Sequence, residues 1–485
     1  MEQMRLKKLF KDIDVVFSKG SKDLEITGVC SHSQFVAPGN LFIAKKGGKS
    51  DGTIFIPEAI QGGAIAIVTD MYNPFIKDVQ QIIYPNISEI EPIIVNRYYR
   101  FPSTHLLMIG ITGTNGKTTT SYLIHHLLDR KESPCGIIGT IECITGKNRF
   151  PSQLTTADVV TNQKYLREMV DFGIKSAVME VTSHGLDQNR VDEIDFDIGI
   201  FTNLSQDHLD YHKTMENYMS AKAKLFERMK EPQKIAIVNG DDPISEKMIA
   251  SSGGRILTFG IEKKADIEAT QISFSIEGTE FITHYQGKSF PIKTPMMGAY
   301  NVYNCLAALS VGLSQGLQIS YLQKKMHSFP GVPGRLERIQ NSKGIYLFVD
   351  FAHTEQALVQ VLSTLSEIKK NRIITIFGCG GDRDQEKRPK MGAAAEKYSD
   401  ELIITSDNPR SEGPLEICRQ VKAGLQGNKP FSIEVDRKKA IAKGIHMAKP
   451  GDIVLIAGRG HEPFQKIGGV QVPFDDREVA RRELS

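Results

Sequence analysis

The chain has 485 residues, of which 40% are hydrophobic and 24% charged, and its formal net charge is +3. This length predicts about three domains of roughly 150 residues each, and the small net charge gives no global bias toward nucleic acid or membrane surfaces. No stretch approaches the roughly 18–20 apolar residues of a membrane span, and the first 18 residues lack the apolar core of a signal peptide. The six cysteines are scattered without a Cys-x-x-Cys pair, which indicates free thiols in a reducing cytoplasm.

The first hundred residues consist of short apolar stretches broken by Gly and Pro, which predicts a small α/β domain over residues 1–103. A new pattern begins at Leu106, where we expect a strand over 106–111, a Gly-rich turn and a helix from Lys117. Further strands are expected at 176–181 and 197–202, three short antiparallel strands within 267–294, and a helix over 301–314. These elements predict a central domain with a mixed sheet over residues 104–331.

The Gly/Pro-rich segment 331–335 is typical of a linker. Beyond it, strands are expected at 345–349, 373–377, 402–405, 432–435 and 453–457, with helical stretches between them. This alternation favours a parallel, doubly wound sheet in a Rossmann-like domain over residues 332–485. The alternative is a mixed α+β domain without a parallel sheet. The predicted fold class is therefore α/β, in three domains.

The segment 109–118, Ile-Gly-Ile-Thr-Gly-Thr-Asn-Gly-Lys-Thr, is typical of a phosphate-binding loop. Gly113 and Gly116 can adopt positive φ and let backbone N–H groups approach phosphate oxygens. Lys117 adds a charge for the outer phosphates, and the hydroxyl of Thr118 can reach Mg²⁺. The spacing is that of a variant, because an Ile stands where the standard loop has its first Gly. The alternative is a turn that only connects strand to helix.

A candidate metal site follows this loop in the sequence. Mg²⁺ prefers oxygen ligands and usually keeps several waters. Glu180 closes the apolar run of an expected strand, where a nucleotide-bound metal would need a carboxylate. The polar segment after the next strand contains Asp207, His208, Asp210 and His212. Taken alone, this segment is as readily interpreted as a polar loop with helix caps as it is as a metal site. The phosphate loop upstream favours the metal site.

Four strands of the C-terminal third are each followed by a polar cluster. The clusters are Asp-Phe-Ala-His at 350–353, Gly-Cys-Gly-Gly-Asp-Arg-Asp at 378–384, Asp-Asn-Pro-Arg at 407–410 and Gly-Arg-Gly-His-Glu at 458–462. In an open parallel sheet they converge at the carboxyl edge, where ligands bind. Arg383 and Arg410 can grip carboxylates bidentately and Glu462 can hold an ammonium, so a zwitterionic ligand is expected there.

These motifs, with Met-Glu-Val-Thr-Ser-His-Gly at 179–185, Gly-Ala-Tyr-Asn at 298–301 and Pro-Gly-Arg-Leu-Glu at 333–337, resemble the Mur ligase family over nearly the whole chain. The resemblance implies an N-terminal UDP-sugar-binding domain, a central ATPase and a C-terminal amino-acid-binding domain. It also implies a ligase of cell-wall synthesis: ATP phosphorylates the D-glutamate side-chain carboxylate of UDP-N-acetylmuramoyl-L-alanyl-D-glutamate, and an incoming amine attacks the acyl phosphate. Phosphorylation supplies a good leaving group, so the protein mainly positions charges and metal.

The resemblance implies site residues position by position. The catalytic set is Lys117, Glu180, His208 and Lys222. The Mg²⁺ ligands are Thr118, Glu180, His208 and Lys222 as its carbamate, with Lys224 as the alternative to Lys222. ATP is contacted by Gly113, Thr114, Asn115, Gly116, Lys117, Thr118, Thr119, Asn301, Arg335, Asp350 and His353. The muramoyl dipeptide is contacted by Ser33, Thr155, Thr156, Thr182, Gln188 and Arg190. The incoming amino acid is contacted by Arg383, Asp407, Asn408, Pro409, Arg410, Gly458 and Glu462.

The Asp-Asn-Pro-Arg cluster resembles that of family members that add meso-diaminopimelate, which carries one carboxylate more than lysine. A lysine would leave Arg383 and Arg410 unpaired in a partly dry pocket. Some positions depart from the family pattern: His32 and Gln34 around Ser33, Leu154 and Ala157 around the paired threonines, Glu355, and Pro463-Phe464.

These departures are compatible with a paralogue that uses a modified acceptor, and a paralogue that uses lysine or another amino acid is a further alternative. A folylpolyglutamate-type or specialised peptide-forming ligase is another, and the Asp-Asn-Pro-Arg cluster and the Ser33 region argue against folate. A non-catalytic nucleotide-binding regulatory module is the alternative of a different class, and the set Lys117, Glu180, His208 and Lys222 argues against it. We expect a cytoplasmic monomer with Mg²⁺ as cofactor and ATP as co-substrate, acting on small molecules without nucleic acid or membrane insertion.

Overall fold

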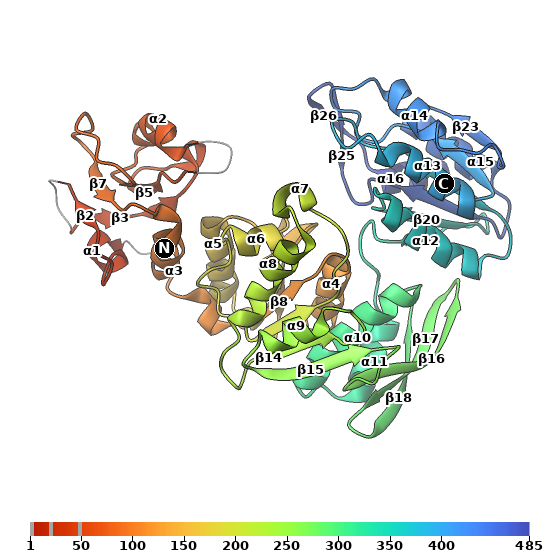
Figure 1. Cartoon of the computed structure of the whole chain (residues 1–485), viewed down its shortest axis with the longest axis horizontal. Helices are drawn as coiled ribbons and strands as arrows, with labels where there is room; N and C mark the ends of the chain where they lie inside the picture. Colours follow the sequence, from red (N-terminus) through yellow and green to blue (C-terminus); the bar gives the residue numbers. More distant parts are fainter. Residues whose placement is uncertain (1–3, 19–22, 47–50, 485) are drawn as a thin grey trace. The chain divides into compact units, whose positions relative to one another are not determined.

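The computed structural model describes residues 4–18, 23–46 and 51–484. The chain divides into two compact units, Met1–Glu268 with Leu306–Leu317, and Ala269–Cys305 with Gln318–Ser485. Each unit is built from α/β layers (Figure 1). The predicted α/β class is confirmed in both.

The N-terminal sheet of the first unit has the order β2-β7-β6-β5-β4, with β2 antiparallel to β7 and the remaining strands parallel. Its strands are β2 (Val16–Phe17), β4 (Gly28–Cys30), β5 (Asn40–Ile43), β6 (Ala66–Thr69) and β7 (Gln80–Ile83); β1 (Met4–Arg5) pairs with β3 (Glu25–Ile26). Successive side chains of a strand point to opposite faces. Leu41 and Ile43 therefore pack with helices α1 (Leu6–Leu9) and α3 (Ile87–Tyr98), while Phe42 packs with α2 (Ile56–Gln61).

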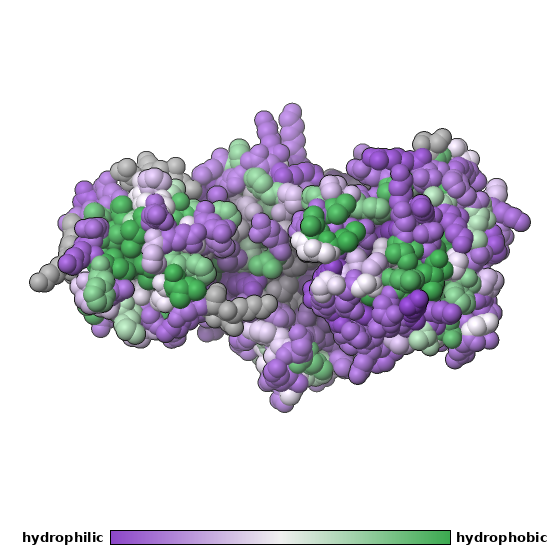
Figure 2. Space-filling view, turned by 90° about the horizontal axis from the view of Figure 1, so that it is seen from above, coloured by the Kyte–Doolittle hydropathy of each residue, from purple (hydrophilic) through white to green (hydrophobic). Residues whose placement is uncertain are grey.

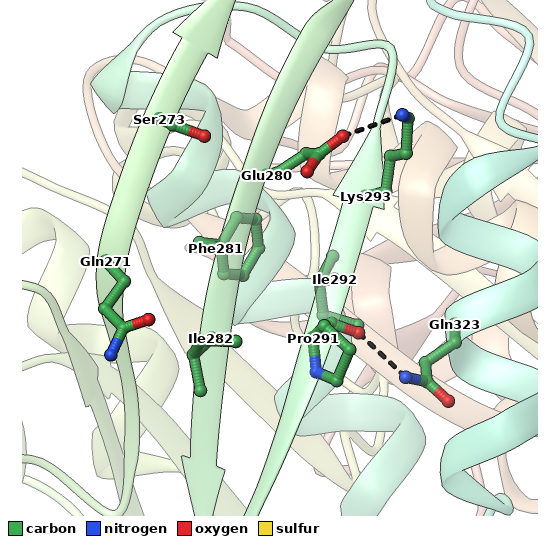
Figure 3. Close-up of a pocket in the computed structure, with 9 residues that line it drawn as sticks. All are labelled: Gln271, Ser273, Glu280, Phe281, Ile282, Pro291, Ile292, Lys293 and Gln323. Atoms are coloured by element: carbon green, nitrogen blue, oxygen red, sulfur yellow. Dashed lines mark hydrogen bonds and ion pairs between the residues drawn. The ribbon is translucent and has the colours of Figure 1, made fainter.

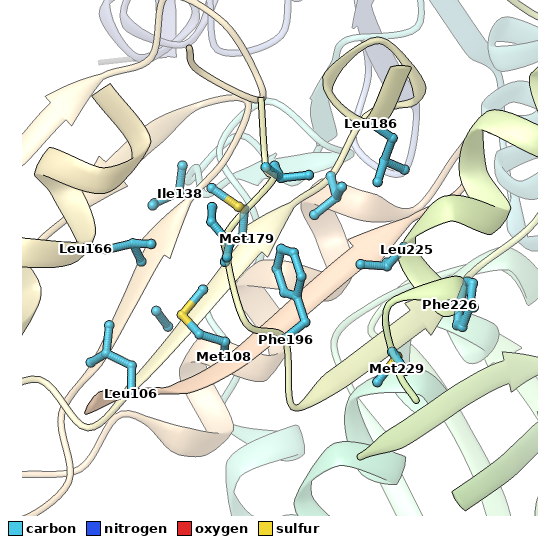
Figure 4. Packing of buried hydrophobic residues seen from close by; sticks show 14 of the residues in the cluster. Leu106, Met108, Ile138, Leu166, Met179, Leu186, Phe196, Leu225, Phe226 and Met229 are labelled. Atoms are coloured by element: carbon cyan, nitrogen blue, oxygen red, sulfur yellow. The ribbon is translucent and has the colours of Figure 1, made fainter. Parts of the chain in front are cut away.

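The central sheet of the first unit carries parallel strands in the order β9-β12-β8-β13-β14-β15, with the antiparallel strands β10 and β11 beyond β9. The strands are β8 (Leu107–Thr112), β9 (Cys135–Ile138), β10 (Glu142–Ile144), β11 (Arg149–Pro151), β12 (Ser176–Glu180), β13 (Ile198–Phe201), β14 (Ile235–Asn239) and β15 (Arg255–Gly260). The helices are α4 (Lys117–Leu128), α5 (Val159–Asp171), α6 (Ser183–Asp187), α7 (Leu209–His212), α8 (Met215–Glu227) and α9 (Ser245–Ala250). Because helices cover the parallel strands, these strands are nearly continuous apolar runs. Figure 4 shows Met108 and Met179 of neighbouring strands packed with Phe196 and Leu225.

The three strands predicted within 267–294 are β16 (Ile267–Ser275), β17 (Gly278–Tyr285) and β18 (Lys288–Thr294). β17 and β18 are antiparallel, as predicted, whereas the first residues of β16 pair in parallel with β15. A hollow of about 500 Å³ lies on the sheet beside α11 (Ile319–His327) and is lined by Gln271, Phe281 and Gln323 among others (Figure 3). Two charged residues that line the hollow, Glu280 and Lys293, form an ion pair with each other at 2.7 Å. None of the predicted site residues lines the hollow.

The C-terminal sheet of the second unit has the order β19-β20-β24-β21-β22-β23. Its strands are β19 (Glu337–Ile339), β20 (Tyr346–Asp350), β21 (Ile373–Phe377), β22 (Glu401–Ile404), β23 (Phe431–Ile433) and β24 (Ile453–Ala457), all parallel except β19. Helices α12 (Glu355–Ile368), α13 (Lys387–Tyr398) and α14 (Pro414–Lys422) cover one face, and α15 (Arg437–Met447) and α16 (Asp476–Leu484) the other. The doubly wound prediction is confirmed, and the α+β alternative is wrong. Helix α10 (Ala299–Ser314) and the hairpin of β25 (Phe464–Ile467) and β26 (Val470–Pro473) complete the chain.

The face of the molecule in Figure 2 is mostly hydrophilic, with separate apolar patches. Large exposed apolar side chains include Met71 and Phe75 in the first unit and Val470 in the second. Within the part of the chain that the structure describes, no helix is both long and apolar enough to cross a membrane.

Candidate active site

The phosphate loop has the backbone that its sequence predicts. β8 leads into residues 113–116, and α4 begins at Lys117. Gly113 and Gly116 have φ of +148° and +86°, which glycine adopts without steric cost. A Cβ at position 113 would lie 1.9 Å from Oγ1 of Thr202, so a side chain there would displace the neighbouring strand end. The first N–H groups of α4 follow directly, and helix N-termini of this kind attract phosphate.

The residues after β13 hold this loop in place. Thr114 N donates to Asn203 O (2.8 Å), Asn115 N donates to Asn203 Oδ1 (2.9 Å), and Oγ1 of Thr202 donates to Asn115 O (2.6 Å). Metal binding was predicted for this segment, whereas the supporting role of Thr202 and Asn203 was not predicted. The available signal was their place at the carboxyl end of an apolar run, which in a parallel sheet adjoins the end of β8.

Glu180 is the last residue of β12 and is fully buried. Its Oε2 accepts hydrogen bonds from the hydroxyls of Thr118 (2.9 Å) and Thr140 (2.8 Å), and its Oε1 accepts from Thr140 N (2.9 Å). The structure thus brings together two of the predicted Mg²⁺ ligands, Glu180 and Thr118. A carboxylate and a hydroxyl fit an ion that prefers oxygen and retains water. Thr140 was missed, because it follows a strand that carries no motif.

Lys222 is 1% exposed, and its Nζ lies 4.3 Å from the ring centre of Tyr218. Nζ of Lys222 and Nζ of Lys117 each donate to the Gly113 carbonyl at 2.8 Å. Burial, and after it the charge of Lys117, places the pKa of Lys222 well below its usual value. The shift is toward the neutral amine, which is the form that can add CO₂ to give a carbamate.

Lys224, the alternative carbamylation site, has a different environment. Its side chain is 38% exposed, and its Nζ forms a 3.0 Å ion pair with Asp187. Its nitrogen is therefore exposed and engaged by a carboxylate, unlike the buried Nζ of Lys222. The geometry therefore favours Lys222 over Lys224.

His208 has φ of +53° and precedes α7. Its half-exposed ring lies 4.9 Å from the ring of His184 and 6.0 Å from that of Tyr218. His212 is buried, with Nε2 2.9 Å from Oγ of Ser183. Over the described residues, no group of three or more His, Cys, Asp or Glu side chains is placed to hold a metal ion. The residues brought together here, Glu180 and Thr118, supply oxygen ligands, and coordination of Mg²⁺ by His208 and by a carbamate of Lys222 remains a prediction.

Five of the six predicted dipeptide residues form one network beside Glu180. Thr156 Oγ1 donates to Glu180 O (2.9 Å) and lies 2.9 Å from Thr182 Oγ1, while Thr155 Oγ1 lies 3.1 Å from Thr140 Oγ1. Arg190 donates to Thr156 O (2.9 Å) and, through Nη2, to Gln188 Oε1 (2.6 Å). The sixth residue, Ser33, is buried in the turn Ser33–Phe35 of the N-terminal sheet.

In the second unit, Asp350 ends β20 and is buried. Its carboxylate accepts from Leu336 N (2.6 Å) and Ala352 N (2.7 Å), and burial raises its pKa. The Arg335 guanidinium lies 4.7 Å from the centre of the Phe351 ring, which in turn is 4.7 Å from the ring of His353. Arg335, Asp350 and His353 therefore belong to one cluster.

Asn301, in α10, uses its amide inside its own segment. Its Nδ2 donates to Met297 O (2.9 Å), and its Oδ1 accepts from Asn304 Nδ2 (2.9 Å). In this structure Asn301 therefore braces the start of α10, and nucleotide contact remains a prediction.

The polar loops after β21, β22 and β24 converge, as predicted. Gly381 N donates to Asn408 O (2.9 Å), and Nη1 of Arg410 donates to Gly381 O (2.6 Å). Asn408 Nδ2 donates to Glu462 Oε2 (2.8 Å), which joins the third loop. These contacts place an arginine, an amide and a carboxylate at one edge of the sheet.

Asp407 and Gly458 also meet at this edge. Oδ2 of Asp407 is buried and makes no hydrogen bond with any described residue, and a Cβ at Gly458 would lie 2.5 Å from it. Arg383 is exposed, with Nη1 donating to Asp382 O (3.1 Å), and Pro409 lies between Asn408 and Arg410. The close approach of Gly458 to Asp407 explains the need for glycine there.

Arg388 is a supporting residue that the sequence did not reveal. Its side chain is fully buried, and it pairs bidentately with Glu412 at 2.8 Å through each terminal nitrogen. Arg388 also donates to Gly380 O (3.2 Å), so its buried side chain connects the loop after β21 with the loop after β22. The guanidinium holds the pKa of Glu412 down at about 2.

Family models match most of the chain. Residues 25–99 match the Mur ligase family catalytic domain, 111–312 the Mur ligase middle domain, and 334–460 the Mur ligase glutamate ligase domain. Two similar proteins are UDP-N-acetylmuramoyl-L-alanyl-D-glutamate–2,6-diaminopimelate ligases. That of Caldanaerobacter subterraneus is 40% identical over 483 residues, and that of Chlamydia felis 41% over 488 residues, each alignment covering 99% of both chains.

Solved structures agree with this likeness. A structure of a UDP-N-acetylmuramoyl-L-alanyl-D-glutamate–2,6-diaminopimelate ligase is 33% identical with a TM-score of 0.71, and the match covers 100% of this chain and 99% of that one. The MurF ligase of Thermotoga maritima in complex with ADP shares the fold at 19% identity and a TM-score of 0.64, over 94% of this chain and 95% of that one. The predicted resemblance is confirmed, and the chain belongs to the Mur ligase family.

Proposed function

We propose that this chain is the ATP-dependent ligase that joins meso-diaminopimelate to UDP-N-acetylmuramoyl-L-alanyl-D-glutamate, in the cytoplasm, for peptidoglycan synthesis. The observation that carries the proposal is the convergence of Asn408, Arg410 and Glu462 at one sheet edge, in a chain about 40% identical to diaminopimelate ligases over its full length. We assign UDP-sugar binding to residues 1–103, ATP binding to 104–331 and amino-acid binding to 332–485.

The first chemical step is phosphoryl transfer from ATP to the D-glutamate side chain. The backbone of residues 113–116 and Lys117 would hold the phosphates, and Arg335, Asp350 and His353 would contact the rest of the nucleotide. Thr118, Glu180, His208 and the carbamate of Lys222 would hold Mg²⁺, which neutralises the charge that builds up between two anionic reactants. The buried position of Glu180 and its 2.9 Å contact with Thr118 support this assignment.

The second step is attack of the amine on the acyl phosphate, which releases phosphate. Thr155, Thr156, Thr182, Gln188 and Arg190 would hold the muramoyl dipeptide, with Ser33 at the uridine end. Holding both reactants in a fixed orientation turns a bimolecular attack into an effectively unimolecular one.

Selection of diaminopimelate follows from charge. Its distal centre carries a carboxylate and an ammonium, where lysine has the ammonium alone. Arg410, with Arg383, would pair with the carboxylate, and Glu462 and the unbonded oxygen of Asp407 would accept from the ammonium. A site built for a charged group disfavours the analogue that lacks it, because the arginines that would pair with the distal carboxylate then lose that partner.

The test is a product assay by mass spectrometry with the UDP-dipeptide, ATP, Mg²⁺ and either diaminopimelate or lysine. We expect a UDP-tripeptide with diaminopimelate, ADP release that requires all substrates, and little product with lysine. Equal use of lysine would refute the specificity. ATP turnover without acceptor, or none at all, would favour a non-ligase. Lys117→Met is the matched inactive control.

A further inference from the structure

The β25–β26 hairpin, at one end of the second unit in Figure 1, lies against the Asp-Asn-Pro-Arg loop. Arg410 N donates to Lys466 O (2.9 Å), and Gly468 N donates to Arg410 O (2.7 Å). Arg410 has φ of +52°, a left-handed conformation that is costly for a side chain other than glycine. Such a conformation persists only where surrounding contacts impose it, and the hairpin supplies them on both sides of the residue.

The same hairpin sets the amide of Asn408. Lys466 N donates to Asn408 Oδ1 (2.8 Å), and a backbone N–H can only donate. The amide oxygen must therefore face the hairpin, which turns Nδ2 toward Oε2 of Glu462 at 2.8 Å. The orientation of the amide, and with it the position of the Glu462 carboxylate, depends on where the hairpin lies.

One side chain of the hairpin itself is buried against the domain. Among residues 464–473, all of which the structure describes, Gln465 alone is buried. Its Nε2 donates to Ser406 Oγ (3.1 Å) and to the carbonyl of Asp407. A two-stranded ribbon is marginally stable by itself, and the remaining side chains of this one are exposed. Gln465 is therefore the buried side-chain anchor of the ribbon, in addition to the backbone bonds at Arg410 and Asn408 and the bond from Nη2 of Arg459 to Phe464 O (2.7 Å).

We propose that Gln465 is a positioning residue for the amino-acid site: it holds the hairpin so that Arg410, Asn408 and Glu462 match the distal centre of diaminopimelate. The inference rests on the proposed function. Gln465 contacts the loop through Ser406 and Asp407, so its effect falls on affinity and selectivity for the amino acid. Contacts with ATP are made elsewhere in the chain and are unaffected.

The test compares Gln465→Met with Gln471→Met in the full-length enzyme. Methionine keeps the length of glutamine and removes both N–H donors. Gln471 is exposed and pairs across the hairpin with Lys466, which makes it the matched control. For Gln465→Met we expect KM for diaminopimelate to rise at least ten-fold, the preference over lysine to fall, and KM for ATP to change less than two-fold. Gln471→Met stays within two-fold of the wild type throughout.

Amide hydrogen exchange gives a second readout that does not depend on turnover. The amides of Lys466 and Arg410 should exchange at least ten-fold faster in Gln465→Met, while those of β21 and β24 keep their rates. If KM for diaminopimelate and the amide exchange rates are both unchanged in Gln465→Met, the inference is overturned. If Gln465→Met does not fold, the inference is overturned in favour of a structural role for Gln465. Wild-type enzyme that makes no tripeptide refutes the proposed function instead.

Discussion

Replacing Arg410 by alanine separates two contributions of its guanidinium. Nη1 donates to Gly381 O at 2.6 Å, and this contact is lost whichever amino acid is bound. Pairing with the distal carboxylate is lost only with diaminopimelate. The bond from the partly exposed, water-screened guanidinium to the Gly381 carbonyl contributes about 1 kcal/mol, and the charge-assisted pair with the substrate carboxylate about 1.5–3 kcal/mol. The value of kcat/KM should therefore fall roughly 70- to 900-fold for diaminopimelate and about five-fold for lysine.

The assay is phosphate release at saturating ATP and UDP-dipeptide, with either amino acid as the varied substrate. Arg419→Ala is the matched control, because Arg419 is a 63% exposed arginine that pairs with Glu416 on α14. That variant should stay within two-fold of the wild type with both amino acids. Equal losses for diaminopimelate and lysine would show that Arg410 only braces the loop, and unchanged kinetics would refute the assignment of the site.

Three further predictions concern other residues. Glu180→Gln keeps the size of the side chain but removes its charge, and we expect ADP release to fall at least about 100-fold; a small change would contradict the metal assignment. Lys222→Met should abolish turnover and the ¹³C carbamate signal seen with labelled bicarbonate, whereas Lys224→Met should retain both. Because Arg388 lowers the pKa of Glu412 to about 2, their pair stabilises the folded state above the unfolded pKa of about 4.3 and loses this effect as pH falls toward 2. Urea unfolding between pH 5 and 3 should therefore depend less on pH in Glu412→Gln than in the wild type.

Buried parallel strands are the part of the fold that the sequence predicts best. The predicted strands 373–377 and 453–457 coincide with β21 and β24, since both are continuous apolar runs covered on two faces. The β25–β26 hairpin was not predicted, although the Gly468–Gly469 pair between its strands is a turn signal. Its apolar residues are exposed, so the hairpin has no buried face and its sequence lacks the sustained alternation of apolar and polar residues that indicates a strand.

The candidate site divides in the same way. Residues on motif loops, such as Lys117 and Arg410, could be predicted because one local segment carries both the turn and the chemistry. Thr140, Arg388 and Gln465 could not, because each acts on a partner 24 to 59 positions away in the sequence. Such contacts depend on which strand ends become neighbours, and that order is a property of the folded sheet.

The two lysines at the Gly113 carbonyl bear on the proposed carbamate of Lys222. As ammonium groups, Lys117 and Lys222 would repel each other in a buried setting where water screens charge poorly. Deprotonation of Lys222 removes the repulsion, and addition of CO₂ to the resulting amine replaces it with attraction to Lys117. The same step creates oxygen ligands of the kind Mg²⁺ prefers. The charge of Lys117 therefore favours both the loss of the proton and the anionic carbamate, and an arginine at position 222, which stays charged, should be as inactive as methionine.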